Sequence, residues 1–174
     1  GLGDTAMTDA VRTSVTGTHT ADQWFLDVAD VSGFAIVDEV LLITMVDPEQ
    51  DLPSNSAGTY STLLIADIDT GLLVFGAPLD RPVDGTGAQK HQVIRIPHYT
   101  DVTVSGTLTC NAWDGATGGV LFFRASGTVT VDADGRIEAD AKGYRGHDRQ
   151  PDNQNGYQGE SFLGTGVQST AANA

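Results

Sequence analysis

The phrase VTVSGTL, Val102 to Leu108, recurs in altered form as VTVDADGRI, Val129 to Ile137. The offset is 27 residues between the VTV triplets and 29 residues between Leu108 and Ile137. A period of about 20 to 30 residues, with a strand, a turn and a strand in each unit, is typical of stacked rungs in a β-solenoid. Two ordinary hairpins remain an alternative, because Ser105-Gly106 and Asp134-Gly135 are both common hairpin-turn pairs.

Short segments rich in β-branched and aromatic residues, separated by Gly, Pro and Asp, indicate strands along most of the chain. The expected strands are Trp24–Val28, Glu39–Met45, Ser61–Ile68, Leu72–Phe75, Gln92–Ile96, Val102–Val104, Thr107–Asn111, Val120–Ala125, Thr128–Val131 and Arg136–Ala139. The sequence therefore predicts an all-β fold, either a sandwich or a β-solenoid-like domain, with an extended C-terminal tail.

Composition divides the chain into three parts. Residues 1–30 are expected to form an N-terminal arm with a short helix or strand, and helical turns are possible within Asp4–Arg12 and Ala21–Val31. Residues 31–141 are expected to form the β-domain. Residues 142–174 are rich in Gly, Asn and Gln and too poor in apolar residues to form a core of their own, so they predict an extended tail.

Two long polar excursions interrupt the strand pattern, Asp47–Gly58 and Asp80–Gln89. Their Pro, Gly, Asp and Ser content is typical of loops. Surface loops often carry binding contacts, so both are candidate binding segments.

The chain is strongly acidic, with 9 Lys and Arg against 23 Asp and Glu and a formal net charge of −14. Like charges repel, so this balance argues against nucleic acid as a partner. Membrane insertion is not expected, because no run approaches the roughly 18 apolar residues of a membrane helix. The single cysteine, Cys110, cannot form an intrachain disulfide and is expected to be a small buried residue.

Trp113 and Asp114 lie in a glycine-rich loop between the two VTV phrases. One interpretation packs the indole in the core, together with Phe122 or Phe123. The other is a glycan-binding platform, in which the ring covers the apolar face of a sugar while Asp114 bonds its hydroxyls.

Calcium is a further candidate ligand, because acidic side chains cluster around the turn at Gly135. The candidate ligands are Asp132, Asp134, Glu138 and Asp140, although their spacing is not that of an EF-hand loop. No other cofactor is expected. The four histidines have no metal-binding spacing, and no nucleophile or phosphate-binding motif is present, so an enzyme is not the expected class.

The tail contains three aromatic residues, Tyr144, Tyr157 and Phe162. Aromatic side chains fill pockets at low entropic cost, so these three are expected to anchor the tail on a neighbouring subunit.

From Asp38 to Gly146 the chain contains, in order, DEVLLI, GTYSTLLI, HQVIRIPHYTDVTV, SGTLTCNAWDGATGGVLFFRASGTVTV and GRIEADAKGYRG. This series resembles a β-rich module of large bacterial surface proteins and phage tail or fibre proteins, which there precedes a glycine-rich tract. The chain departs from the module at His147, where other residues replace the glycine tract. The resemblance implies a structural or attachment role at a surface and brings no catalytic residues.

These observations favour a structural or attachment protein of a virion or an extracellular assembly, such as a tail, fibre, coat or filament subunit. We expect it to work as a homo-oligomer, or with other virion or surface proteins. A glycan-binding module of a surface adhesin is the alternative, and a polysaccharide-degrading enzyme is the third reading.

Overall fold

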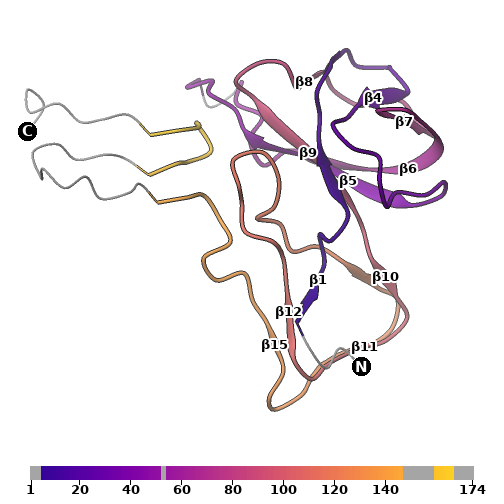
Figure 1. Cartoon of the computed structure of the whole chain (residues 1–174), viewed down its shortest axis with the longest axis vertical. Helices are drawn as coiled ribbons and strands as arrows, with labels where there is room; N and C mark the ends of the chain where they lie inside the picture. The colour runs from indigo at the N-terminus through magenta and orange to yellow at the C-terminus, as the bar shows by residue number, and fades with distance from the viewer. Residues whose placement is uncertain (1–4, 52–53, 147–158, 167–174) are drawn as a thin grey trace, which may run out of the picture.

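A computed structural model describes residues 5–51, 54–146 and 159–166 of the chain. Within these ranges all regular secondary structure is β, which confirms the predicted all-β class. The strands form two bodies, a curled antiparallel sheet and, below it in Figure 1, a stack of parallel strands. Among the described residues there is no helix long and apolar enough to cross a membrane.

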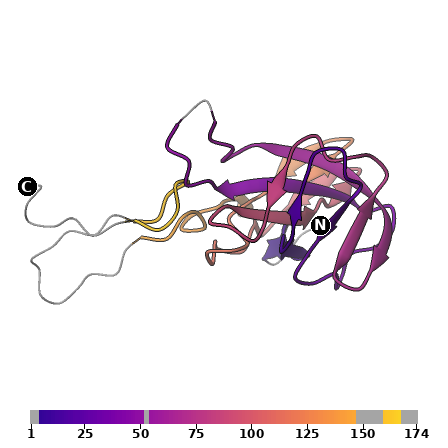
Figure 2. The same cartoon turned by 90° about the horizontal axis from the view of Figure 1, so that it is seen from above.

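The antiparallel body is a six-stranded sheet with the strand order β2-β9-β5-β6-β7-β4. Its strands are β2 (Arg12–Ser14), β4 (Phe25–Asp27), β5 (Glu39–Val46), β6 (Tyr60–Asp69), β7 (Leu72–Phe75) and β9 (Lys90–Arg95). The sheet curls, as Figure 2 shows, until an isolated bridge between Val15 and Val28 joins the ends of its two edge strands. A small pair, β3 (Thr18–His19) and β8 (Val83–Asp84), extends one side of it.

Both faces of the central strand β5 are covered. Val40 and Leu42 point into the core enclosed by the curled sheet, whereas Leu41 packs outside with Ile94 and Phe122. A strand buried on both faces reads in the sequence as a continuous apolar run, which explains the segment EVLLITMV. Of the predicted strand Val120–Ala125 only Arg124–Ala125 forms a strand, whereas Val120 and Phe122 pack on this outer face without strand pairing.

The parallel body consists of two stacked rungs, each with three short strands. The upper rung holds β10 (His98–Tyr99), β11 (Val102–Val104) and β12 (Thr107–Thr109), and the lower rung holds β13 (Arg124–Ala125), β14 (Val129–Val131) and β15 (Arg136–Ile137). Val102 pairs with Val129, and Leu108 with Ile137, all in parallel. The solenoid interpretation of the repeated phrase is therefore confirmed, and the two-hairpin alternative is wrong.

Residues 5–30, expected as an arm with a short helix or strand, form four short strands and no helical turn. β1 (Ala6–Met7) pairs in parallel with β12 and so adds to the solenoid. β2 and β4 are the edge strands of the six-stranded sheet. Long-range pairing of this segment with both bodies outweighs its weak helical pattern.

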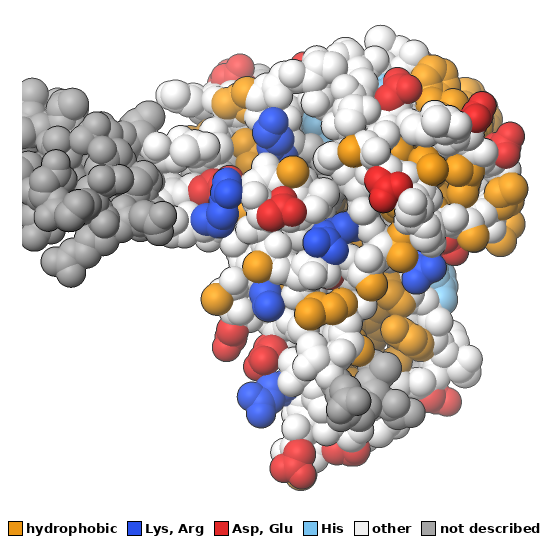
Figure 3. All heavy atoms as spheres, in the orientation of Figure 1, with side chains coloured by type: hydrophobic (Ala, Val, Ile, Leu, Met, Phe, Trp, Pro, Cys, Tyr) orange, Lys and Arg blue, Asp and Glu red, His pale blue; other side chains and the backbone are white. Residues whose placement is uncertain are grey.

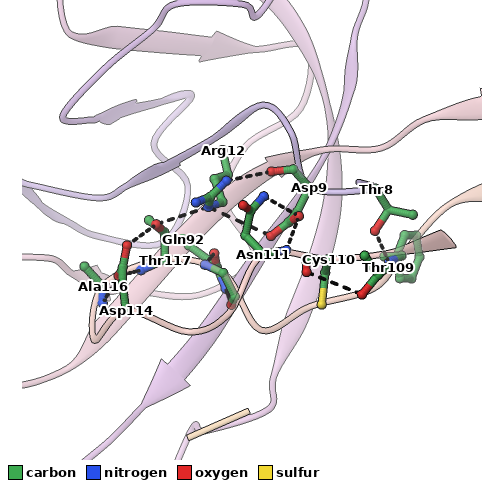
Figure 4. A network of polar contacts seen from close by, with 12 residues as sticks. Thr8, Asp9, Arg12, Gln92, Thr109, Cys110, Asn111, Asp114, Ala116 and Thr117 are labelled. Carbon is green, nitrogen blue, oxygen red and sulfur yellow. Dashed lines mark hydrogen bonds and ion pairs between the residues drawn. The ribbon is translucent and has the colours of Figure 1, made fainter. Parts of the chain in front are cut away.

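A buried polar network fixes the two bodies to one another (Figure 4). Asp9, which is fully buried, accepts hydrogen bonds from the backbone N and the side-chain Nδ2 of Asn111, at 2.8 and 3.0 Å. The amide side chain of Gln92 exchanges two hydrogen bonds with the backbone of Gly118, at 2.9 and 2.8 Å. Buried polar groups are costly unless they are paired, so this network specifies how the sheet and the solenoid join.

Candidate functional site

A groove lies where the curled sheet meets the solenoid. It consists of two adjoining hollows, of about 530 and 430 Å³, which share His98 and Tyr99 as lining residues. Its walls come from the start of β5, the end of β9, and the strands β10 and β13. The groove is therefore a product of the junction between the two bodies.

An ion-pair cluster crosses this groove. Arg124 binds both carboxylate oxygens of Glu39, with two contacts of 2.7 Å, and His98 Nε2 lies 2.7 Å from Glu39 Oε2. The hydrogen bonds from Arg124, supported by His98, lower the pKa of Glu39. Glu39 is therefore ionised at neutral pH, and its charge holds both partners in a fixed orientation.

Two aromatic contacts adjoin the polar cluster. The ring of Tyr99 makes an edge-to-face contact with Phe123, with 6.1 Å between centroids. The guanidinium of Arg124 lies 5.9 Å from the centroid of the Phe122 ring, within the range of a cation–π contact. These contacts restrict Tyr99 and Arg124 before any ligand arrives.

The rim of the groove is apolar and partly strained. Val37 is 78% exposed and has a φ of 68°, a conformation rare for a β-branched residue, and its N–H donates to Ile65 O at 2.8 Å. Ile36, which precedes Val37 in the chain, is also exposed, and so is Leu64, which pairs with Glu39. Strained backbone and exposed apolar side chains often mark surfaces that contact a ligand or a partner.

A separate hollow, of about 250 Å³, lies where the two polar excursions converge, with Asp47 and Ser56 from one and Arg81 and Asp84 from the other. Both carboxylates already have several donors. Burial opposes ionisation of Asp47, but hydrogen bonds from Ser56, Glu49 and Gln89 together outweigh it and lower its pKa to about 2. Hydrogen bonds from Thr86 and others lower the pKa of Asp84 to about 2 as well. These acids therefore brace their loops through hydrogen bonds within the chain.

The lower rung of the solenoid is uncovered among the described residues. Val104 and Leu108 of the upper rung are fully buried, whereas Val131 and Ile137, their counterparts below, are 46% and 40% exposed. Val129 is 41% exposed. In the described part of the chain, β13, β14 and β15 each pair with one neighbour only, so their outer edges have no strand partner.

Trp113 and Asp114, the residues of the predicted glycan platform, are both engaged by contacts within the chain. Trp113 is only 2% exposed, so its ring face cannot stack on a sugar, and the packed alternative holds. Its ring contact is Tyr144, at 6.2 Å between centroids, rather than Phe122 or Phe123, which belong to other clusters. Asp114 accepts hydrogen bonds from the loop backbone, at Ala116 and Thr117, each 2.8 Å. The glycines of this loop let its backbone turn tightly, and the tight turn buries the indole.

The calcium interpretation gains no support from the structure. Asp132, Asp134, Glu138 and Asp140 are all described, yet no three His, Cys, Asp or Glu side chains within the described ranges are grouped so as to hold a metal ion. Asp132, Asp134 and Asp140 are exposed, and Glu138 is partly exposed with Oε2 3.9 Å from Arg136 Nη1.

Two of the three expected tail anchors lie in the described residues. Tyr144 packs on Trp113 and its hydroxyl donates to Met45 O, so it holds the chain to its own β5. Phe162 is 40% exposed, while its carbonyl accepts from Asp47 N at 2.8 Å. Tyr157 lies outside the described residues. Anchoring of the tail on a neighbouring subunit remains a prediction for Phe162 and Tyr157.

Sequence reasoning missed the groove residues, although one signal points to them. His98 pairs with Arg124, and Tyr99 with Ala125, in parallel, so the repeat extends upstream of VTV. Aligning HYTDVTV with RASGTVTV, with a one-residue gap in the shorter phrase, would have placed His98 and Arg124 one above the other. Glu39 lies 59 positions before His98 in the chain and no local pattern links them.

The acidic charge has no single focus on the face shown in Figure 3. Acidic side chains are scattered over both bodies and alternate with Lys and Arg. A scattered distribution is typical of a solvated surface.

Comparison with known proteins gives limited similarity. No protein-family model matches the chain, and no curated protein matches it. Among solved structures, the tailspike protein gp49 from Pseudomonas phage LKA1 is similar over 76% of this chain, with 10% identity and a TM-score of 0.44. The Gp54 tailspike of Acinetobacter baumannii bacteriophage AP22, solved in complex with A. baumannii capsular saccharide, is similar over 70%, with 12% identity and a TM-score of 0.42. The chain spans 23% of the length of each.

Proposed function

We propose that this chain is a structural and attachment module of an extracellular or virion-surface assembly, such as a phage tail or fibre, and that it works there with a neighbouring subunit. The observation that carries the proposal is the uncovered lower rung. A solenoid rung cannot bury its apolar face alone and relies on the next rung to cover it. Val129, Val131 and Ile137 remain 40 to 46% exposed, beside strand edges that lack partners in the described part of the chain.

Unpaired edges with exposed apolar residues favour association with other chains, and isolated proteins usually protect them. Here Asp132 and Asp134 lie at the corner after β14 and Arg136 lies at the start of β15, whereas β14 carries Val129 and Val131. The charged corner keeps the isolated chain soluble, and the valine strand offers backbone hydrogen bonds to a partner.

Hydrogen exchange tests this proposal. The amide protons of Val129 and Val131, which face the unpaired edge of β14, are expected to exchange rapidly in the dilute isolated chain and at least tenfold more slowly in the native assembly, because a partner strand then holds them. The amides of Val102 and Val104 in β11 are the control, since both face β14 in the isolated chain and Val102 N donates to Thr128 O at 2.9 Å. Equal exchange of β14 in the two states would contradict an assembly role for this surface.

Glycan binding is a second candidate function, and the groove at the junction favours it. Saccharides are bound by planar polar side chains that are held in place beside an aromatic residue. Glu39, His98 and Arg124 are fixed by their mutual contacts, and Tyr99 is fixed by Phe123.

Titration calorimetry with oligosaccharides of acidic and neutral type tests the glycan candidate. Tyr99→Ala is expected to weaken binding at least tenfold, whereas Tyr99→Phe, which keeps the ring on Phe123, should retain most of the affinity. Arg124→Lys should weaken binding as well, since a single ammonium cannot hold Glu39 through two parallel bonds. Unchanged affinity in Tyr99→Ala and Arg124→Lys would exclude the groove as the binding site.

A further inference from the structure

We infer that the uncovered lower rung binds the same rung of a second copy of this chain, end to end about a two-fold axis, with β14 antiparallel to its own counterpart. This inference rests on the proposed assembly role and specifies the partner and the geometry.

The surface is suited to a strand like itself. Within one chain the VTV strand β11 already pairs with the VTV strand β14 in perfect register, and the valines at each end stack on valines. Val129 and Val131 of β14 thus stack on the VTV strand β11 above them, and the same two side chains are presented at the lower edge of β14. A second VTV strand would continue the apolar stack and remove Val129 and Val131 from water.

The chain itself leads away from this surface. After β15, the backbone returns to the junction, where Trp113 N donates to Lys142 O at 2.8 Å and Tyr144 bonds Met45 in β5. Figure 1 shows this segment running from β15 back toward the six-stranded sheet. The next described residues are held at the same place, since Glu160 pairs with Arg145 at 3.0 Å. The described continuation of the chain therefore forms no third rung.

The opposite end of the solenoid differs from the lower rung, which disfavours a head-to-tail stack. There, β1 covers β12, and Val120 and Phe122 pack under the outer face of the six-stranded sheet. Val102 and Val104 of the upper rung are already buried, so the upper end offers no exposed valine strand for the lower rung of another copy to cover. Contact between two lower rungs is self-complementary and ends with two copies, as two-fold interfaces do.

The strand lengths and corners fit this geometry. A two-fold axis through Thr130 places Val129 opposite Val131 of the second copy, with both side chains still facing inward. It also sets the two-residue strand β13 beside the two-residue strand β15 of the other copy. The acidic corner at Asp132 and Asp134 then lies opposite the uncharged corner Ser126–Thr128, which avoids repulsion between like charges.

A cysteine placed on the axis tests the arrangement directly. Thr130 faces outward and would lie opposite its own copy, where antiparallel Cα atoms are about 4.5 to 5.5 Å apart. That separation is within the range of about 4.4 to 6.8 Å that a disulfide spans. Thr130→Cys is therefore expected to give a covalent dimer under mild oxidation.

Thr103→Cys is the matched control, because Thr103 is the exposed residue stacked one rung above Thr130. Its copies would be three strand spacings apart, about 14 Å, which is too far for a disulfide. The native Cys110 is buried, and burial raises the pKa of its thiol, so it does not compete. A Thr130→Cys chain that stays monomeric, or a Thr103→Cys chain that cross-links equally well, would overturn the inference.

Sedimentation equilibrium supplies the second measurement. The unmodified chain should shift from monomer to dimer with concentration, and Val131→Lys should raise the dissociation constant at least tenfold, because the ammonium would be buried at the interface. Thr103→Lys should leave it unchanged. If the unmodified chain is monomeric while β14 is protected from exchange in the native assembly, the second copy is ruled out and the assembly role stands. If β14 is also unprotected there, both proposals fail.

Discussion

Leu108 and Ile137 occupy equivalent positions in two successive rungs, so their truncation measures how much a covering rung contributes. Leu108 is fully buried, whereas Ile137 pairs directly below it and is 40% exposed. Leu108→Ala and Ile137→Ala each remove three carbon atoms, worth about 0.8 kcal/mol each when fully withdrawn from water. The chemistry of the two changes is matched, and their surroundings differ.

For Leu108→Ala the lost transfer free energy is about 2.4 kcal/mol, and a closed cavity in the solenoid core adds to it, so we expect a loss of about 3 to 5 kcal/mol. For Ile137→Ala about three-fifths of the transfer term applies and water fills the space, so we expect about 1 to 1.5 kcal/mol. The expected losses differ because the lower rung covers Leu108 in the upper rung, whereas no further rung covers Ile137.

Urea unfolding followed by intrinsic fluorescence gives both free energies, provided that the slope of the transition is the same in the two variants. The measurements belong at low micromolar concentration, where association through the lower rung is weakest, and a repeat at tenfold higher concentration detects any dimer contribution. Equal losses for Leu108→Ala and Ile137→Ala at low concentration would refute the uncovered rung, and with it the reasoning on assembly.

Three further outcomes are expected. Trp113→Ala should lower the free energy of unfolding by about 3 to 5 kcal/mol, measured by urea unfolding, because the indole is buried, and a change below about 1 kcal/mol would contradict its core role. Gly118→Ala should destabilise the fold in the same assay, since φ is 93° and a Cβ would overlap the carbonyl oxygen of Ala112, whereas Gly143→Ala, with open space around it, should be neutral. Burial lowers the pKa of His91 from 6.5 to about 4, so the unfolded chain binds the proton more readily and stability should fall as the pH drops from about 6.5 to about 4. His91→Gln should flatten that part of a stability profile measured between pH 7 and 4, and an unchanged slope would show that another group is responsible.

Local sequence pattern was sufficient for much of this protein. Period-two alternation and glycine-rich turns specified the all-β class and gave the strand β7 and the strand β11 with their observed bounds. The repeated phrase predicted the pairing of Val102 with Val129 and of Leu108 with Ile137, because stacked rungs place equivalent residues one above the other. Such features depend on residues close in the chain or on a repeat that can be read directly.

Features that depend on contacts between distant segments needed the tertiary structure. Glu39, His98 and Arg124 meet only because β5 packs against the solenoid, and nothing near Glu39 in the sequence names its partners. A tryptophan at position 113 is compatible with both the platform and the core interpretation. The two are distinguished by Tyr144, which returns from the tail to cover the ring. The exposure of Val131 was equally hidden, since its phrase is nearly identical to that of buried Val104. Sequence determines which side chains a rung presents, and only the fold decides whether another rung covers them.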